Sequence, residues 1–233
     1  MPFAAEIFTA SVVAVGNFNP AIFSPDWLER NKLIGEGDSA SAREGSAGKA
    51  LLVSPQVTNF DTEWFALQVV DTQFSLASKG VLSPAFKDLS SGIFQLLRHT
   101  PISAVGLNFS GHFKLADVDQ YHKVGDVLAP KDIWDGLFPG DSTGLEQLTI
   151  RFQRGPRDKP SSKDDRRITI QPSRRVKYGV SLSINNHYDV SVGVSTEPTS
   201  AERVAELVDG QWELAWKDAV TVFDQLLSQA IAK

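Results

Sequence analysis

The chain has 233 residues, of which 42% are hydrophobic and 22% are charged, and it contains no cysteine. This composition excludes a largely disordered chain, and the lack of cysteine excludes a disulfide framework, thiol catalysis and a thiolate zinc site. The formal net charge is −5, but residues 151–177 hold ten Lys or Arg against three Asp. Such a basic segment in an acidic chain is typical of a surface for nucleic acid or an acidic partner.

The first residues, MPFAAEIF, lack the basic residues and the long apolar run of a secretory signal. No stretch of the sequence reaches the roughly 18 consecutive apolar residues that a membrane span needs. We therefore expect a soluble, cytoplasmic protein that makes no contact with a membrane.

The N-terminal quarter predicts a strand, a helix and a loop. Ile7–Gly16 is apolar on both alternating faces, which predicts a central strand covered on both sides. Ser24 followed by Pro-Asp is a typical helix start, and we expect that helix to end near Leu33. Residues 35–49 are small and polar, which predicts a mobile loop.

The middle of the chain predicts a hairpin, a helix and another strand. Residues 64–78 fit a hairpin with a two-residue turn, in which Val69 faces Phe74 on the apolar side. Residues 84–98 form an amphipathic helical pattern, and residues 102–109 form a largely apolar strand.

The last third predicts strands and a long helix. Residues 148–154 and 167–171 alternate as strands around an exposed basic loop at 155–166. Residues 176–184 and 188–194 alternate again, and their register favours a hairpin with a three-residue loop. The C-terminal helix starts at a capping box, Thr199 with Glu202, and Gly210 is a point at which it could bend.

These elements lack regular βαβ alternation, which argues against a doubly wound fold. We expect one α+β domain over residues 1–233, with a mixed or largely antiparallel sheet, helices packed on one face and a long C-terminal helix.

Histidines and aspartates gather in residues 112–126, and they are the weak catalytic candidates. Imidazole and carboxylate groups can together bind a metal if they converge, but their spacing matches no established motif. A solvated connection with local hydrogen bonds is the alternative. Because this spacing fits no metal-binding pattern, we expect no metal. Walker A and G-x-G-x-x-G motifs are also lacking, so we expect no nucleotide cofactor and, more generally, no cofactor. The histidines and aspartates of this candidate cluster are His112, Asp117, Asp119, His122 and Asp126.

Asn17, Asn19 and Asn108 lie at the ends of expected central strands. Amide side chains at such places can bind polar ligands, or they can satisfy backbone groups where the chain leaves the sheet. Both interpretations remain open.

The basic segment has three interpretations: a solvated sheet edge, a surface for an acidic protein, or a nucleic-acid surface without aromatic residues for stacking. Two tryptophans on the C-terminal helix are core or interface anchors. The candidate partner-binding residues are Arg151, Arg154, Arg157, Arg174, Arg175, Lys177, Trp212 and Trp216.

Three segments resemble a family of uncharacterised, sporadically distributed bacterial proteins with no assigned activity. They are VGNFNPAIFSPDW (15–27), LLRHTPISAVGLNFSGHF (96–113) and LAPKDIW (128–134). The resemblance covers most of the chain and implies a bacterial cytosolic origin, but it carries over no catalytic residue.

We therefore expect a non-catalytic binding or assembly protein, a component of a bacterial multi-protein system such as antiviral (phage) defence or toxin–antitoxin. It would act through a protein partner or through self-association. The alternatives are a metal-dependent or acid–base hydrolase that uses residues 112–126, and nucleic-acid binding through residues 151–177.

Overall fold

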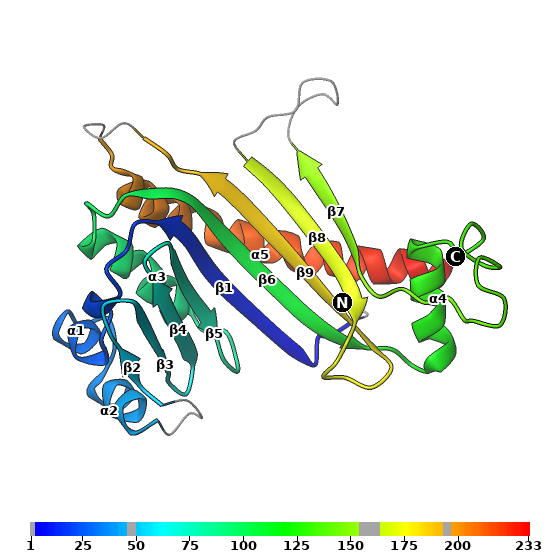
Figure 1. The fold of residues 1–233 in the computed structure, drawn as a ribbon, viewed down its shortest axis with the longest axis horizontal. Coiled ribbons are helices and arrows are strands. Elements are labelled where there is room, and N and C mark those ends of the chain that lie inside the picture. The colour runs from blue at the N-terminus through cyan, green and yellow to red at the C-terminus, as the bar shows by residue number, and fades with distance from the viewer. Residues whose placement is uncertain (1–2, 46–49, 154–163, 193–196) are drawn as a thin grey trace.

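The computed structural model describes residues 3–45, 50–153, 164–192 and 197–233. It is an α+β fold built on a nine-stranded antiparallel sheet with the strand order β2-β3-β4-β5-β1-β6-β9-β8-β7 (Figure 1). The strands are β1 (Ile7–Gly16), β2 (Leu52–Val53), β3 (Val57–Asp61), β4 (Phe65–Val70), β5 (Gln73–Ser78), β6 (Ile102–Lys114), β7 (Leu148–Gln153), β8 (Asp164–Pro172) and β9 (Gly179–Asp189). The helices are η1 (Pro20–Ile22), α1 (Pro25–Arg30), α2 (Glu36–Glu44), α3 (Pro84–Leu96), α4 (Val118–Leu128) and α5 (Ser200–Ala232).

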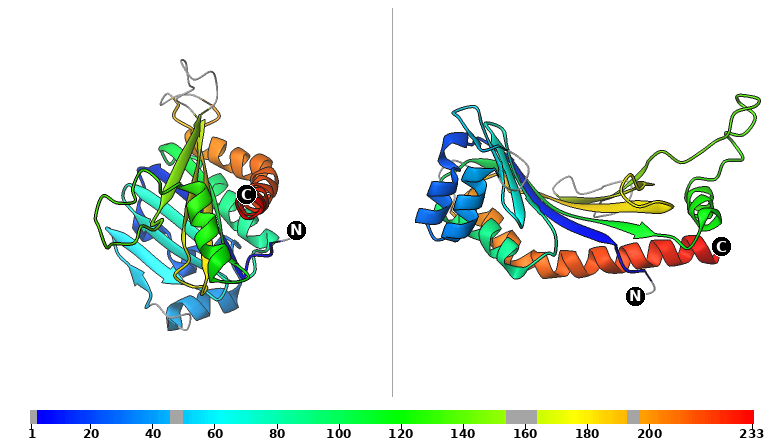
Figure 2. Two further views of the ribbon diagram at one scale, coloured as in Figure 1. Left: turned by 90° about the vertical axis from the view of Figure 1, so that its right-hand side faces the viewer. Right: turned by 90° about the horizontal axis from the view of Figure 1, so that it is seen from below.

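Helix α5 runs along one face of the sheet and packs against α3, β6, β9 and α4 (Figure 2). The side of the sheet that it covers is called the helix face below, and the other side is called the open face. The capping box that begins α5 is confirmed, because Thr199 Oγ1 accepts from Glu202 N and Glu202 Oε2 accepts from Thr199 N. The helix continues without interruption through Gly210, the residue at which the sequence suggested that it could bend.

The hairpin of β4 and β5 has the predicted register. Val69 pairs with Phe74 and Leu67 with Leu76, and all four side chains are fully buried. A turn of two residues fixes the register, and one buried face makes a slip costly. The prediction of this hairpin is confirmed.

Strand β1 is central, as expected. The sequence also predicted that both of its faces would be covered, and this prediction is wrong. Ala10, Val12 and Ala14 are buried on the helix face. Thr9 and Ser11 point to the open face, where Val15 is 46% exposed. Antiparallel sheets commonly leave one face to solvent, and this sheet does so although β1 is rich in valine.

The expected hairpin at residues 185–187 is wrong, because β9 continues through these residues to Asp189. Asn185, Asn186 and His187 pair with β6 on one side and β8 on the other. The amide of Asn186 is almost fully buried on the helix face and donates to Leu107 O over 3.2 Å. A polar residue that finds a backbone partner can remain inside a strand, so the asparagines did not mark a turn.

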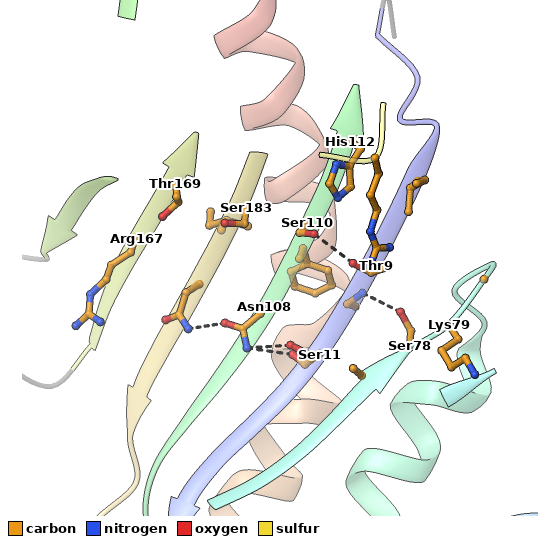
Figure 3. A pocket seen from close by; sticks show the side chains of 18 of the residues that line it. Thr9, Ser11, Ser78, Lys79, Asn108, Ser110, His112, Arg167, Thr169 and Ser183 are labelled. Carbon is orange, nitrogen blue, oxygen red and sulfur yellow. Dashed lines mark hydrogen bonds between the residues drawn. The ribbon is translucent and has the colours of Figure 1, made fainter. Parts of the chain in front are cut away.

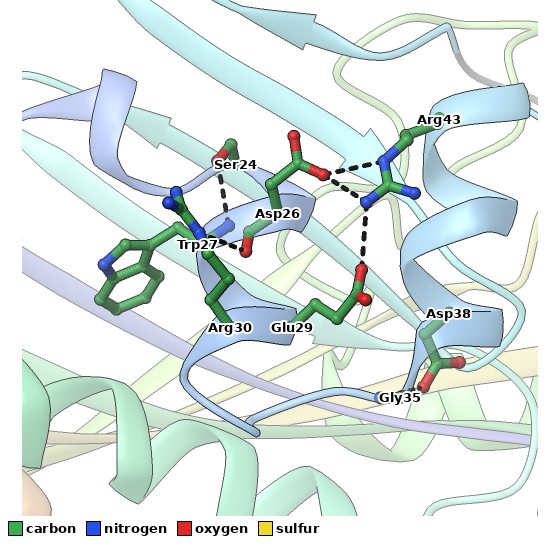
Figure 4. Close-up of polar contacts among 8 residues, drawn as sticks. All are labelled: Ser24, Asp26, Trp27, Glu29, Arg30, Gly35, Asp38 and Arg43. Atoms are coloured by element: carbon green, nitrogen blue, oxygen red, sulfur yellow. Dashed lines mark hydrogen bonds and ion pairs between the residues drawn. The ribbon is translucent and has the colours of Figure 1, made fainter.

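The expected mobile loop at 35–49 is wrong for most of its length, because residues 36–44 form α2. Arg43 of α2 binds both Asp26 and Glu29 of α1, the latter at 3.0 Å (Figure 4). The Asp38 carboxylate accepts from Trp64 Nε1 over 2.9 Å, which joins α2 to the sheet. Tertiary contacts therefore order a polar segment that lacks an apolar stripe; residues 46–49 lie outside the described part.

A projecting segment between α4 and β7 exposes apolar side chains. Ile133, Trp134, Leu137 and Phe138 are 75%, 53%, 59% and 74% exposed. Figure 2 shows this segment extending away from the sheet at the end where α4 lies. Among the described residues, no helix is both long and apolar enough to cross a membrane.

Candidate functional site

The open face carries rows of polar side chains, and each row runs across several neighbouring strands through residues that are paired in register. One row has only hydroxyl groups, because Thr9 of β1 pairs with Ser110 of β6, and Ser183 of β9 with Thr169 of β8. Ser110 pairs in turn with Ser183, and Thr169 with Thr149 of β7. Alternation places these residues on the same face, with neighbouring Cβ atoms about 4.5–5.5 Å apart. The hydroxyls of Thr9 and Ser110 are 3.2 Å apart, and those of Thr149 and Thr169 are 3.0 Å apart.

The next row along the strands is built from amides and arginine. Ser11, Asn108 and Asn185 lie on β1, β6 and β9, and the row continues to Arg167 on β8. Asn108 Nδ2 donates to Ser11 Oγ over 3.2 Å, and Asn185 Nδ2 donates to Asn108 Oδ1 (Figure 3). Asn185 Oδ1 is buried and makes no hydrogen bond within the described part of the chain.

Gly106 gives the two asparagines room. A Cβ atom at Gly106 would lie 3.1 Å from Asn185 Nδ2 and 3.6 Å from both terminal atoms of Asn108. A larger residue would push on the amide pair from one side. The glycine therefore helps to keep the amide row in position.

His112 on β6 closes the polar surface at the other end. Its Nδ1 lies 2.8 Å from the hydroxyl of Ser173, which belongs to the turn between β8 and β9. Burial lowers the pKa of His112, and the positive charge of Arg175 lowers it further. The imidazole is therefore neutral near neutral pH.

The side chains of the two polar rows, together with His112, line a hollow of about 790 Å³ on the open face, called the sheet hollow below. Its cations are Lys79, Arg167 and Arg175, and no carboxylate of a described residue lines it. Lys79 Nζ lies 3.4 Å from Asp61 Oδ2, and Arg167 lies 3.2 Å from Asp165 Oδ2, just outside the lining. The hollow offers hydroxyls, amides and positive charge, which suits an anionic ligand with hydrogen-bonding groups.

The His/Asp cluster of residues 112–126 is divided between two elements. His112 lies on β6, whereas Asp117 caps α4 by accepting from Gln120 N over 2.8 Å. Asp119 and His122 lie on α4 itself, and Asp126 there binds Lys131. Among the described residues, no group of three or more His, Asp and Glu side chains could hold a metal ion.

Part of the basic segment gathers beside the sheet hollow. Arg174, Arg175 and Lys177 are exposed in the turn between β8 and β9, and Lys177 Nζ lies 4.9 Å from the ring centre of Tyr178. Arg151 on β7 is instead bound to the buried Asp165, with Nη2 2.6 Å from Oδ2. Arg154 and Arg157 lie outside the described residues, as do most of residues 155–166.

The two tryptophans differ in burial. Trp212 is 2% exposed and packs on Phe86 and Phe109, with ring centres 5.5 Å and 5.1 Å away. The folded protein therefore cannot offer Trp212 to a partner, and its place among the partner-binding candidates is corrected to core. Trp216 is partly buried against Phe8 and lines an apolar hollow of about 700 Å³.

Sequence reasoning identified His112, Asn108 and Arg175 but missed the hydroxyl row. Asn108 lies in the middle of β6, not at a strand end, and Asn19 instead caps η1 by accepting from Ala21 N. The missed signal was the alternation Ser181, Ser183, Asn185 in β9, which places three polar side chains on the open face. This alternation becomes visible only when residues 179–189 are treated as one continuous strand, without a turn at Asn185.

No family model matches the chain, and the search of curated proteins gave no match.

Proposed function

We propose that the protein is a non-catalytic binding protein that takes an anionic, hydrogen-bonding ligand in the sheet hollow. The observation that carries the proposal is the lining of this hollow: rows of hydroxyls and amides with Lys79, Arg167 and Arg175, and no carboxylate of a described residue. A volume of about 790 Å³ falls within the usual range for small-molecule sites, about 300–1,000 Å³.

Support for binding over catalysis comes from the Ser173–His112 pair. A nucleophilic serine needs a free hydroxyl beside its base, and the base needs a third group that orients it. The Ser173 hydroxyl already accepts backbone N–H groups from Arg175 and Val176. His112 uses Nδ1 for this serine, and no described carboxylate orients its ring.

The test is amide NMR of the labelled protein during titration with sugar phosphates and dicarboxylates, with the parent sugars as uncharged controls. We expect saturable shifts confined to the residues that line the hollow, among them Thr9, Asn108, Ser110, Thr169 and Ser183. Ser183→Trp should fill the hollow and abolish them, whereas Gln68→Trp, on the same face but outside the lining, should leave them unchanged. Shifts that map elsewhere, or no shift with any anion, would overturn the proposal.

A second function, self-association, is favoured by a different observation. The projecting segment exposes Ile133, Trp134, Leu137 and Phe138, and the same chain holds the apolar hollow lined by Phe8 and Trp216. A second copy could therefore supply both the apolar knob and its receptor, in a head-to-tail contact.

Sedimentation velocity at rising concentration tests this second function. Trp134→Asp on the knob and Val81→Asp at the hollow, where Val81 is 93% exposed, should each give monomers. An equal mixture of the two variants should give dimers and nothing larger, since one contact is restored. Val118→Asp, exposed outside both surfaces, is the control. A wild-type protein that remains monomeric at every concentration contradicts self-association.

A further inference from the structure

One corner of the sheet hollow has the chemistry of an anion site. His112 reaches it from β6, and Ser173 and Arg175 reach it from the turn between β8 and β9. His112 and Arg175 both line the hollow. The corner therefore combines groups that are more than sixty residues apart in the sequence, through the pairing of β6 with β9.

The hydrogen bonds of Ser173 determine the direction of its hydroxyl proton. Its Oγ accepts from Arg175 N over 3.2 Å and from Val176 N over 2.9 Å. A hydroxyl has two lone pairs and one proton, so with both lone pairs used it can serve the ring only as a donor. The Ser173 hydroxyl therefore donates to His112 Nδ1, 2.8 Å away.

This contact fixes the tautomer of the imidazole. A neutral ring that accepts at Nδ1 must carry its proton on Nε2. The lowered pKa of His112 agrees, because burial and Arg175 both favour the neutral ring. Nε2–H makes no hydrogen bond with any described residue, so it is free to donate to a ligand.

Arg175 provides the charge. Unlike Lys79 and Arg167, it makes no ion pair within the described part of the chain. A guanidinium without a protein carboxylate is suited to two parallel hydrogen bonds with an oxyanion. Arg174 and Lys177, exposed in the same turn, add to the positive potential.

We infer that His112 Nε2–H and the Arg175 guanidinium bind a phosphate group of a small polar ligand, whose remainder lies along the hydroxyl and amide rows. This inference rests on the proposed function and names its ligand class. A small molecule is favoured over a nucleic-acid strand because the described lining contains no exposed Phe, Tyr or Trp on which bases could stack: Phe109 is fully buried on the helix face.

The first experiment examines the tautomer in the free protein. Nitrogen-15 NMR of the His112 side chain at about pH 7.5 should show the proton on Nε2. Ser173→Ala should allow both tautomers, because the donor to Nδ1 is lost. A wild-type ring protonated on Nδ1 overturns the inference, and it leaves the proposed function standing since other donors line the hollow.

The second experiment titrates the protein with inorganic phosphate, and with acetate in parallel. Phosphate should shift the Nε2 signal of His112, and Arg175→Gln should weaken binding by about tenfold or more, as expected for a lost charge-assisted hydrogen bond. Arg174→Gln removes an adjacent charge outside the lining and should have a much smaller effect.

His112→Phe keeps a ring but removes the donor, so it should also weaken phosphate binding about tenfold. His112→Gln provides an N–H donor again and should restore part of the phosphate affinity. Thermal denaturation of each variant separates loss of binding from loss of fold. Equal affinity for acetate would make the site a carboxylate site and overturn the phosphate assignment. If phosphate shifts the NMR signals of Arg167 and Asn185 but not those of His112, the inference is overturned and the proposed function stands. If no anion shifts any signal in the hollow, the proposed function is overturned as well.

Discussion

The two faces of the sheet differ residue by residue along the same strands. Phe109 and Ile184 pair on the helix face and are at most 2% exposed. Their chain neighbours Ser110 and Ser183 pair on the open face and remain partly exposed. The helix face is covered by α3 and α5, whereas no described helix packs on the rows of the open face (Figure 2). Stability and ligand binding are thus assigned to opposite sides of one sheet, and mutations should separate them.

The largest effect should come from the helix face, at Trp212. Trp212→Ala removes a side chain that is 98% buried between Phe86 and Phe109, so we expect a loss of about 3–5 kcal/mol in the free energy of unfolding. Chemical denaturation measures it. Trp216→Ala, at a partly buried site on the same helix, should cost less. A loss below about 1 kcal/mol for Trp212→Ala would mean that α5 does not hold the sheet as described.

The sharpest comparison uses two adjacent residues of β9. Leu182 faces the helices and is fully buried, whereas Ser183 faces the open side and makes no side-chain hydrogen bond with a described residue. Leu182→Ala should cost about 2–5 kcal/mol, and Ser183→Ala should change stability by less than about 0.5 kcal/mol. Urea denaturation of both variants gives the values. Similar losses would show that the open face also contributes to the core.

A smaller gain is expected on the outer side of α5. Gly210 is exposed inside the helix, and a Cβ atom there would meet nothing within 4 Å. Gly210→Ala should therefore raise the free energy of unfolding by about 0.5–1 kcal/mol. Thermal and chemical denaturation test this, with Gly106→Ala as the contrasting glycine, since its Cβ would press on Asn185. If Gly210→Ala destabilises the protein, the helix is not regular at this point.

The smallest effect is a pH dependence that belongs to the open face. Burial and Arg175 lower the pKa of His112 below its ordinary value of 6.5, so the unfolded chain binds this proton more tightly than the folded protein. Stability should therefore fall as the pH decreases below about 6.5, and His112→Phe should reduce that fall. Denaturation at several pH values measures it, and His122→Phe, exposed on α4, is the control. An unchanged pH profile in His112→Phe would contradict the assigned environment.

The sequence predicted most of the helix face and little of the open face, for a physical reason. Buried positions such as Val69 and Phe74 carry a strong periodic signal, and a two-residue turn fixes their register. The polar rows become a site only when β1, β6, β9 and β8 are placed side by side, and strand order cannot be read from local alternation. Asn185 and Asn186 were interpreted as turn residues because asparagine favours turns, and tertiary pairing overrode that preference.

Two other differences have the same origin. Residues 36–44 have a polar composition typical of a loop, yet Arg43, paired with two acidic side chains of α1, helps to hold them as a helix. Trp212 and Trp216 lie four residues apart on one stripe, but only the contacts of the folded protein separate the core residue from the partly exposed one. Long-range partners determined these outcomes.

The length of α5 also limits which insertions and deletions the protein can tolerate. Its 33 residues span about 50 Å, and they contact α3 and α4 as well as the sheet. A single inserted codon near Gly210 would rotate every later residue by about 100°, which would move Trp212, Phe223 and Leu227 off the sheet together. Insertions and deletions should therefore be almost absent from this helix across relatives of the chain, and should collect instead in the projecting segment between α4 and β7.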